Sequence, residues 1–291
     1  MVNKIILGTV QLGLNYGINN TNGKPSTDEA MAILNLAYDS GISILDTAEA
    51  YGNSQEIIGL FHKKHPDKKF EVITKLSQVE NITNTTLKQL VENNIKTLQV
   101  TNLYCYMFHH FDEFLEKKEL IKELLVLKKE KKIQKIGISI YHNSELSYIL
   151  ENTTYFDIIQ VPFNLLDNAS IKKELLEKAK RKNIEIHVRS VFLQGLFFKP
   201  LDQLPEKLKV LEKEIIKLQN IQKENEIDMA TLALKYTLEK KYIDYCLIGV
   251  DSVVQLKNNL KTIVKRTPIP HQEIDTIKVE NTELLNPTNW N

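Results

Sequence analysis

Four side chains that can take part in acid–base chemistry each follow an apolar, strand-like run. Asp46 and Tyr51 follow one run, Lys75 ends the next, and His109 ends a third. In a parallel α/β barrel the carboxyl ends of the strands meet on one face, where active sites are built. A Tyr beside a Lys on that face forms a proton donor with a tuned pKa. The order of these residues therefore predicts a proton-transfer site.

A lysine at the mouth of a barrel needs a partner, because burying an ammonium costs desolvation energy unless a carboxylate pairs with it. Lys75 follows directly on an apolar run, and Asp46, one strand away, is the available partner. His109 and His110 are adjacent, and strand side chains alternate between two faces. At most one of these imidazoles is therefore expected to point into the barrel mouth.

The elements that must position these residues alternate along the chain. Apolar runs predict strands at residues 5–10, 43–45, 70–74, 103–108, 135–139, 157–161, 184–188 and 245–248. Helical patterns follow at residues 26–41, 54–62, 83–96, 113–132, 144–150, 169–182, 205–240 and 253–264. The first of these begins with Ser26 and Glu29 spaced as a capping box.

This alternation predicts a parallel sheet. Eight units of near-equal size favour a closed (β/α)8 TIM barrel that occupies residues 1–291 as a single domain. No Gly-x-Gly-x-x-Gly opens any unit, which argues against a Rossmann dinucleotide site.

Composition narrows the function classes. The formal net charge is +1 and charged residues make up 26%, so no bulk electrostatic attraction to nucleic acid or an anionic membrane is expected. No run reaches the roughly 18 apolar residues of a membrane span, and the apolar run at the N-terminus is too short for a signal peptide. Both observations predict a cytoplasmic protein.

Cys105 and Cys246 are expected to be small buried hydrophobic residues. No metal site is predicted, since only the His109-His110 pair approaches ligand spacing.

The ordered set resembles the aldo-keto reductases, with their Asp/Tyr/Lys/His tetrad. Residues 46–52 match the family's D-T-A-x-x-Y-G, residues 73–75 its strand-three lysine, and residues 103–109 its strand-four histidine. The resemblance extends over residues 4 to 264, through further similar segments at 7–13, 136–139, 159–165, 195–196 and 248–260.

The resemblance implies reversible hydride transfer between a nicotinamide and a small-molecule carbonyl substrate. Tyr51 is then the general acid. Lys75 is expected to lower the pKa of the phenol, and Asp46 to hold Lys75. His109 would orient the carbonyl oxygen as a neutral imidazole donor.

The resemblance also implies the cofactor contacts. Ser139 and Gln160 match positions that hold the carboxamide, Arg189 and Ser190 are expected beside the nicotinamide, and Gly249, Ser252 and Asn259 match the adenosine end. Backbone N–H groups at the start of a helix there favour phosphate.

Three positions depart from the family pattern. Ile140 replaces an Asn that contacts the carboxamide, and Arg189 replaces the aromatic ring that stacks on the nicotinamide. Asp251 and Gln255 stand where many relatives carry Arg or Lys for the 2′-phosphate, and Asp251 would repel that phosphate. The cofactor expected is therefore NADP or NAD, with both open.

Residues 8–17 with Arg189-Ser190 are similar to reductases found among bacterial surface-polysaccharide enzymes, which suggests a sugar-like carbonyl substrate. Two rival functions stay open. One is a cofactor-binding regulatory or sensor barrel without significant turnover, similar to the potassium-channel β subunits. The other is a barrel enzyme that uses Lys75 as a Schiff base. The sequence indicates no oligomeric state.

Overall fold

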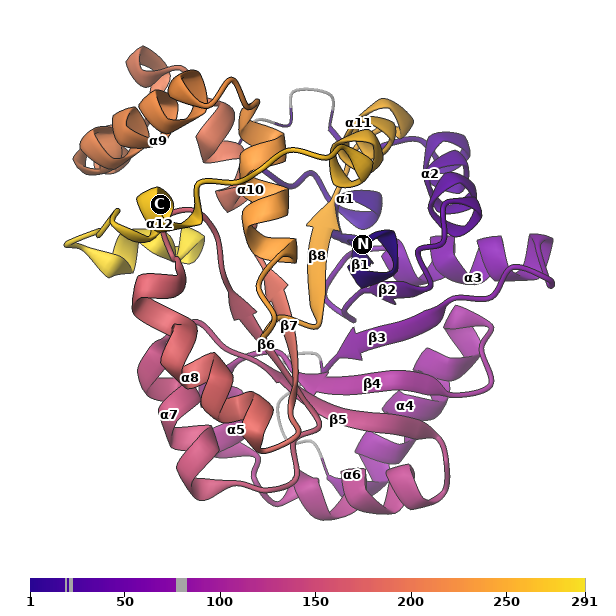
Figure 1. The fold of residues 1–291 in the computed structure, drawn as a ribbon. Helices are drawn as coiled ribbons and strands as arrows, with labels where there is room; N and C mark the ends of the chain where they lie inside the picture. Colours follow the sequence, from indigo (N-terminus) through magenta and orange to yellow (C-terminus); the bar gives the residue numbers. More distant parts are fainter. Residues whose placement is uncertain (19, 21–22, 77–82, 291) are drawn as a thin grey trace.

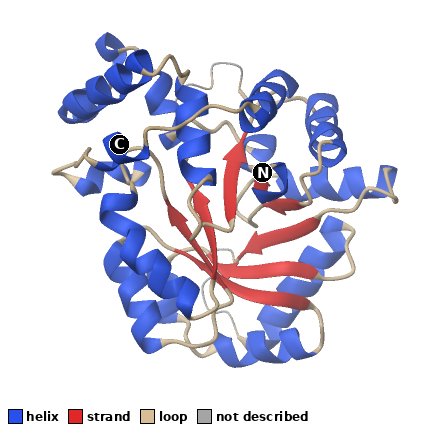
Figure 2. Ribbon diagram, in the orientation of Figure 1, coloured by secondary structure: helices blue, strands red, loops and turns tan. Residues whose placement is uncertain are grey.

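Eight parallel strands close a barrel in the order of the chain, which confirms the predicted (β/α)8 architecture. The structure is a computed structural model and describes residues 1–18, 20, 23–76 and 83–290. The strands are β1 (Ile5–Gly8), β2 (Ile44–Asp46), β3 (Glu71–Lys75), β4 (Leu103–Phe108), β5 (Ile133–Ser139), β6 (Ile158–Pro162), β7 (Glu185–Arg189) and β8 (Tyr245–Gly249). Helices surround them (Figures 1 and 2).

The longer helices follow the strands, and all but the last of them, α11, connect one strand to the next. They are α2 (Thr27–Asp39), α3 (Ser54–Lys64), α4 (Asn84–Leu98), α6 (Leu120–Lys129), α7 (Asn143–Asn152), α8 (Ala169–Arg181), α9 (Glu212–Glu224), α10 (Met229–Leu238) and α11 (Val253–Val264). Short elements complete the chain: α1 (Val10–Gly13), α5 (Phe111–Glu116), α12 (His271–Asp275) and the 3₁₀ helices η1 (Val2–Lys4), η2 (Leu193–Phe198), η3 (Leu201–Gln203), η4 (Glu206–Leu211), η5 (Thr282–Leu285) and η6 (Pro287–Trp290).

The predicted capping box of α2 is only half formed. Ser26 Oγ accepts from the Glu29 backbone N–H at 3.2 Å, as a helix N-cap should. The Glu29 carboxylate reaches instead to another helix, where it accepts from the Val253 backbone N–H at 2.8 Å. A negative charge therefore lies at the positive end of α11, and it ties α2 to that helix.

The single helix predicted over residues 113–132 is wrong, because the segment divides into α5 and α6. Phe114 of α5 packs against Phe108 and Phe156, whereas Leu124 and Leu127 of α6 are buried against the barrel. On one continuous helix Phe114 and Leu127 would point roughly 140° apart. A break at residues 117–119 lets both faces be buried.

The helical region predicted over residues 205–240 is also divided, into η4, α9 and α10. Asp228 begins α10, because its carboxylate accepts from the Thr231 backbone N–H at 2.8 Å. Glu226 precedes it with a left-handed φ of 53°, which ends the continuous helical path. Helix α9, coloured orange, lies at the periphery of the molecule (Figure 1).

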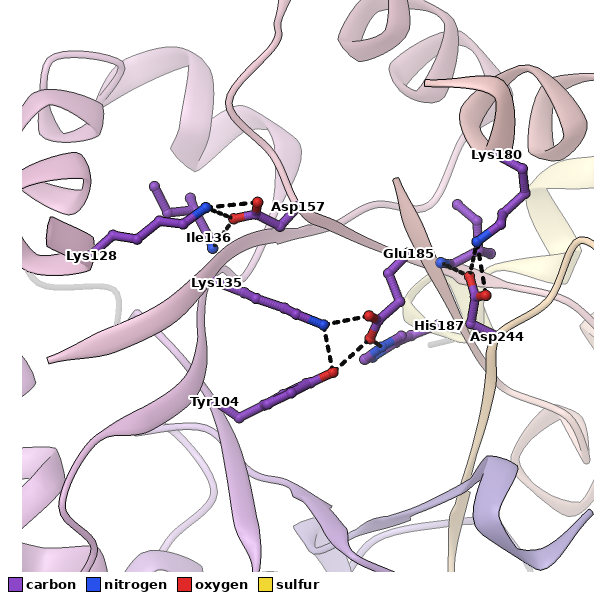
Figure 3. A network of polar contacts seen from close by, with 10 residues as sticks. Tyr104, Lys128, Lys135, Ile136, Asp157, Lys180, Glu185, His187 and Asp244 are labelled. Atoms are coloured by element: carbon purple, nitrogen blue, oxygen red, sulfur yellow. Dashed lines mark hydrogen bonds and ion pairs between the residues drawn. The ribbon is translucent and has the colours of Figure 1, made fainter. Parts of the chain in front are cut away.

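Carboxylates fix strand register near the amino ends of the strands (Figure 3). Asp157, just before β6, accepts from the Ile136 backbone N–H at 2.9 Å and from Lys128 Nζ of α6 at 2.6 Å. The same arrangement recurs two units later with Asp244, the Ile186 N–H and Lys180. Each carboxylate thereby joins a helix to the strand that follows it and to the start of the next strand.

A polar cluster fills the barrel interior near the same amino ends (Figure 3). Glu185 accepts from Tyr104 Oη at 2.9 Å, contacts His187 Nε2 at 2.6 Å, and forms an ion pair with Lys135. Burial opposes ionisation of Glu185, but the hydrogen bonds and charges of His187 and Lys135 outweigh it and lower its pKa to about 2. The carboxylate is therefore the ionised centre of this cluster.

Two further observations bear on the composition-based expectations. Cys105 and Cys246 are both free and buried, which confirms their predicted role as buried hydrophobes. In the part of the chain that the structure describes, no helix has the length and apolar character needed to cross a membrane.

Candidate active site

The four side chains of the predicted tetrad come together in one cavity. The cavity has a volume of about 510 Å³, and Asp46, Tyr51, Lys75 and His109 all line it. Asp46 ends β2 and Lys75 ends β3, whereas His109 follows directly on β4. The cavity is therefore at the carboxyl ends of the strands, the face of the barrel where active sites are built.

Lys75 and Asp46 form a buried ion pair. Lys75 Nζ is 2.5 Å from Asp46 Oδ1 and also donates to the Thr47 carbonyl oxygen at 3.0 Å. The residues are 1% and 2% exposed. Burial opposes the charged ammonium, but the attraction of Asp46 and Tyr51 outweighs it and raises the pKa of Lys75. Lys75 is thus held as a cation beside the phenol.

Gly13 and Gly52 allow two backbone segments to approach each other closely, and this contact fixes the position of the loop that carries Tyr51. A Cβ on Gly13 would lie 1.8 Å from the Tyr51 carbonyl oxygen, and one on Gly52 would lie 2.5 Å from the Gly13 carbonyl oxygen. Gly52 also has a φ of +54°, which favours glycine. Side chains at either position would push the loop, and Tyr51 with it, away from the cavity.

A chain of buried hydroxyls, which sequence reasoning missed, supports the same loop. Ser54 Oγ donates to Thr9 Oγ1 at 2.8 Å and contacts Thr47 Oγ1 at 3.1 Å. Thr9 Oγ1 in turn donates to the Asp46 carbonyl oxygen at 2.9 Å. The three hydroxyls therefore join β1, β2 and the start of α3 beneath Tyr51. Short polar side chains at the two ends of the loop are the only signal of this role in the sequence.

The pKa of Tyr51 is not lowered overall, contrary to the sequence-based expectation. Burial raises it and is the largest effect, while the Lys75 ammonium, 5.2 Å from the ring centroid, and the Arg189 charge lower it in part. The phenol is consequently protonated at neutral pH, the state that a general acid requires. Lys75 would stabilise the phenolate that remains once the proton has left.

Of the two adjacent histidines, only His109 lines the cavity. The His109 and His110 rings stack with centroids 4.6 Å apart, and the Tyr51 ring lies 5.8 Å from that of His109. Burial, together with the charge of Lys75 and further charges from His110 and Arg189, lowers the pKa of His109 to about 2. The imidazole is thus neutral and can donate one N–H into the cavity.

Ser139 and Gln160, the predicted carboxamide contacts, both line the cavity. They are register partners on β5 and β6. Gln160 Nε2 also donates to Asp46 Oδ2 at 2.8 Å, a contact that the sequence did not suggest. Ile140, which replaces the family Asn, is buried and lies outside the lining.

Arg189 stacks on a residue that sequence reasoning missed. Its guanidinium carbon lies 4.0 Å from the Tyr141 ring centroid, and its Nη2 donates to the Ile140 carbonyl oxygen at 3.0 Å. Nη1 lies 3.3 Å from Ser190 Oγ. Among the described residues no carboxylate oxygen lies within 4.0 Å of Arg189, so its charge faces the cavity without an ion-pair partner.

The residues predicted for the adenosine end do not all reach the cavity. Gly249 and Asn259 line it, as do Asp251 and Gln255. Ser252 does not line the cavity; its hydroxyl caps α11 by accepting from the Gln255 backbone N–H at 3.3 Å.

The segment after β7 closes one side of the cavity. Val191, Phe192, Gln194 and Phe198 line it, and left-handed backbone at Ser190, Leu193 and Gln194 turns the chain over the barrel mouth. Gln194 Nε2 donates to Tyr16 Oη at 2.9 Å. Tyr16 follows α1, so this bond bridges the cavity from the first strand–helix unit to the seventh.

Two buried hydrogen-bond acceptors in the cavity have no donor in the described part of the chain, which indicates what kind of ligand the cavity suits. Gln11 Oε1 and Asp251 Oδ1 are buried and have no hydrogen-bond partner among the described residues, although both residues line the cavity. A buried acceptor needs a donor. The hydroxyl and amide groups of a nicotinamide dinucleotide supply such donors, whereas a phosphate at Asp251 would not. The residues present therefore fit a nicotinamide dinucleotide.

Known proteins resemble this chain over most of its length. The family model described as "Aldo/keto reductase family" matches residues 4–280. The chain is 24% identical to L-galactose dehydrogenase of Arabidopsis thaliana, with 84% of this chain and 80% of that protein covered. It is also 24% identical to a Schizosaccharomyces pombe protein that carries the name of a voltage-gated potassium channel β subunit, with 84% and 82% covered.

Solved structures share the fold. An aldo-keto reductase from Bacillus halodurans, solved in its holo form, superposes with a TM-score of 0.75 at 20% sequence identity. The match covers 94% of this chain and 91% of that one. At this level of identity the likeness concerns the barrel itself.

Proposed function

The chain belongs to the aldo/keto reductase family of oxidoreductases, and on that premise we propose that it reduces the carbonyl of an aldehyde or ketone to an alcohol with NADH or NADPH. The nicotinamide supplies the hydride when bound. The protein supplies the proton, the orientation of the carbonyl and a site shielded from water. We also propose that residues 1–291 act as one domain; a cytoplasmic location stays a prediction from the sequence.

Each tetrad residue has a distinct role in this proposal. The Tyr51 hydroxyl donates its proton to the carbonyl oxygen, and the Lys75 ammonium stabilises the phenolate that forms. Asp46 keeps Lys75 in place beneath the Tyr51 ring. The neutral His109 ring donates an N–H to the same carbonyl oxygen and thereby fixes its position.

One observation carries the proposal. A buried lysine–carboxylate pair, a protonated phenol and a neutral imidazole line a single cavity at the carboxyl ends of β2, β3 and β4. A structural ion pair alone would not require a phenol and an imidazole whose rings lie 5.8 Å apart beside it.

For the cofactor, we propose that Ser139 and Gln160 hold the carboxamide, and that Gly249 and Asn259 contact the adenosine end. Asp251 favours NADH over NADPH, because its unpaired buried oxygen would accept from a ribose hydroxyl and repel a 2′-phosphate. Glu29 adds a second negative charge at the start of α11, on the Val253 N–H.

The Schiff-base alternative conflicts with the geometry of Lys75. A nucleophilic lysine must be neutral, whereas the Asp46 pair raises the pKa of Lys75 and keeps it protonated. A regulatory barrel that binds the cofactor without significant turnover is the second candidate, favoured by the likeness to the protein named as a channel β subunit.

The test begins with cofactor binding and continues with turnover. NADH and NADPH are titrated separately against the protein, and a panel of sugar, aliphatic and aromatic aldehydes is then offered to the loaded protein. We expect oxidation of the cofactor, and a fall of at least roughly 100-fold in Tyr51→Phe with cofactor affinity unchanged. Tight cofactor binding without oxidation by any carbonyl would support the regulatory candidate. Turnover by Tyr51→Phe within a few-fold of wild type would exclude Tyr51 as the donor.

A further inference from the structure

A second cavity lies beside the main one. Its volume is about 270 Å³, and Tyr141 lines both cavities. Pro162, which lines the second cavity, is the register partner on β6 of Arg189, which lines the first. The two cavities are therefore neighbours at the ends of β5, β6 and β7, and Tyr141 is the residue that lines both.

A buried ion pair contributes to the second cavity. Lys172 Nζ is 2.8 Å from Asp167 Oδ2, and the two residues are 3% and 5% exposed. Among the described residues, no group donates a hydrogen bond to the other carboxylate oxygen, Asp167 Oδ1. Lys172 Nζ likewise has no acceptor there besides Asp167. Burial is the largest effect on both groups, raising the pKa of Asp167 and lowering that of Lys172. The pair thus presents an acceptor and a donor that are short of partners.

The remaining polar lining consists of amides, hydroxyls, the Glu283 carboxylate and the His142 imidazole. The C-terminal segment contributes Thr282, Glu283 and Asn286, and α7 contributes Asn143 and Ser144. Asn286 Oδ1 already accepts from Thr288 at 3.1 Å, which leaves the amide Nδ2 to donate. Both carboxylates of the lining have a basic group beside them: Lys172 pairs with Asp167, and His142 Nδ1 lies 3.8 Å from Glu283 Oε1. The described lining therefore offers an anion no cation without a carboxylate beside it. Side-by-side donors and acceptors suit hydroxyl groups, each of which can both donate and accept.

We propose that the second cavity is a subsite for a neutral, polyhydroxylated group, so that the substrate carries such a group at the end remote from its carbonyl. This proposal rests on the proposed carbonyl reduction in the main cavity. The carbonyl lies at Tyr51 and His109, the chain of the substrate passes Tyr141, and the hydroxylated end bonds to Asp167, Lys172 and Asn286.

A binding measurement tests the subsite without turnover. The probe is a methyl hexopyranoside, which is neutral and has no free carbonyl, and saturation-transfer NMR reports its binding to the cofactor-loaded protein. We expect binding to wild type and its loss in Asp167→Leu/Lys172→Met, which replaces the whole ion pair by apolar groups. Asn286→Asp is the second variant, since it keeps an acceptor for Thr288 and replaces the donor by a negatively charged oxygen, a charge change that the control variant matches. Asn152→Asp, exposed on α7 and outside both cavities, is the matched control.

A kinetic comparison tests whether the two cavities serve one substrate. Glyceraldehyde is compared with the same aldehyde carrying a hexosyl group, in wild type, Asn286→Asp and the control. We expect kcat/KM to fall roughly ten-fold in Asn286→Asp for the hexosyl aldehyde, as for the loss of one hydrogen bond, and less than about two-fold for glyceraldehyde.

The outcomes separate the two proposals. Equal effects on both aldehydes, or hexoside binding that survives in both variants, would overturn the subsite while leaving carbonyl reduction in place. Hexoside binding that is lost in the variants, with no aldehyde reduced by wild type, would support the subsite and overturn the reductase. Failure of the hexoside to bind wild type would overturn the subsite directly.

Discussion

Gln160 donates from Nε2 to Oδ2 of Asp46 at 2.8 Å, and the same carboxylate holds Lys75 through Oδ1 at 2.5 Å. The amide predicted to hold the cofactor is therefore one carboxylate away from the cation beside Tyr51. A shift of the Gln160 side chain on cofactor binding would move the Asp46 carboxylate and thereby the Lys75 ammonium that it holds. This contact predicts that cofactor binding and the acidity of the phenol are coupled.

Lys75→Met should slow turnover by roughly 100-fold and move the alkaline limb of the pH–rate profile to higher pH. The Lys75 charge lowers the pKa of Tyr51, so its removal raises that pKa further, and the phenol stays protonated to higher pH. The profile is measured from pH 6 to 11, with Lys63→Met, an exposed lysine on α3, as the control. A limb that stays in place or moves to lower pH would show that Lys75 does not act on the phenol.

Asp251→Arg should tighten NADPH relative to NADH. One charge-assisted hydrogen bond to the 2′-phosphate is worth about 1.5–3 kcal/mol, so the ratio of the two Kd values should change by roughly ten-fold or more. Fluorescence titration with each cofactor measures both constants. Asp251→Asn separates loss of the negative charge from gain of a positive one. The assignment fails if wild type already binds NADPH far more tightly than NADH.

Arg189→Leu should remove a preference for substrates with an acidic or phosphorylated group near the carbonyl. The guanidinium has no ion-pair partner in the described part of the chain and offers a planar pair of donors to such a group. Glyceraldehyde 3-phosphate and glyceraldehyde are compared in wild type, Arg189→Leu and Arg189→Lys. We expect wild type to favour the phosphorylated aldehyde by roughly ten-fold, the Lys variant to retain part of this, and the Leu variant to lose it. Equal discrimination in all three would assign Arg189 to packing on Tyr141 alone.

Glu185→Gln should destabilise the barrel at neutral pH and have a diminishing effect in acid. The folded-state pKa of Glu185 is about 2, below its ordinary value of 4.5, so its ionised contacts stabilise the fold above that ordinary value. This contribution is lost as the pH falls towards 2. The difference in Tm between wild type and variant should therefore be largest at pH 6–7 and shrink below about pH 4. Glu174→Gln, exposed on α8, is the control, and a difference that does not depend on pH would contradict the assigned shift.

The barrel and the ion pair at its mouth were predictable because both follow from local rules. Alternating strand and helix patterns allow few topologies, and Lys75 after an apolar strand requires a carboxylate one strand away. The division of residues 113–132 was not predictable, because the direction in which Phe114 must face depends on Phe156, on another unit of the barrel.

The rest of the site depends on contacts between residues that lie far apart in the sequence. The bond from Gln160 to Asp46 links β6 to β2, and the stacking of Arg189 on Tyr141 links β7 to the segment after β5. The second cavity needs the C-terminal segment to lie against α7 and α8. The direction in which the pKa of Tyr51 shifts was also not predictable, since it depends on whether burial or the Lys75 charge has the larger effect.

The C-terminal segment contains an intrinsic fluorophore. Trp290 is the single tryptophan of the chain, and its Nε1 donates to the Leu284 carbonyl oxygen at 2.8 Å, within the segment that borders the second cavity. Indole emission is therefore tied to η5 and η6, whereas a reduced nicotinamide in the main cavity emits at longer wavelengths. A ligand that moves η5 would change the indole emission, while the cofactor is read at its own wavelength, so one sample would show whether the two cavities fill together or one after the other.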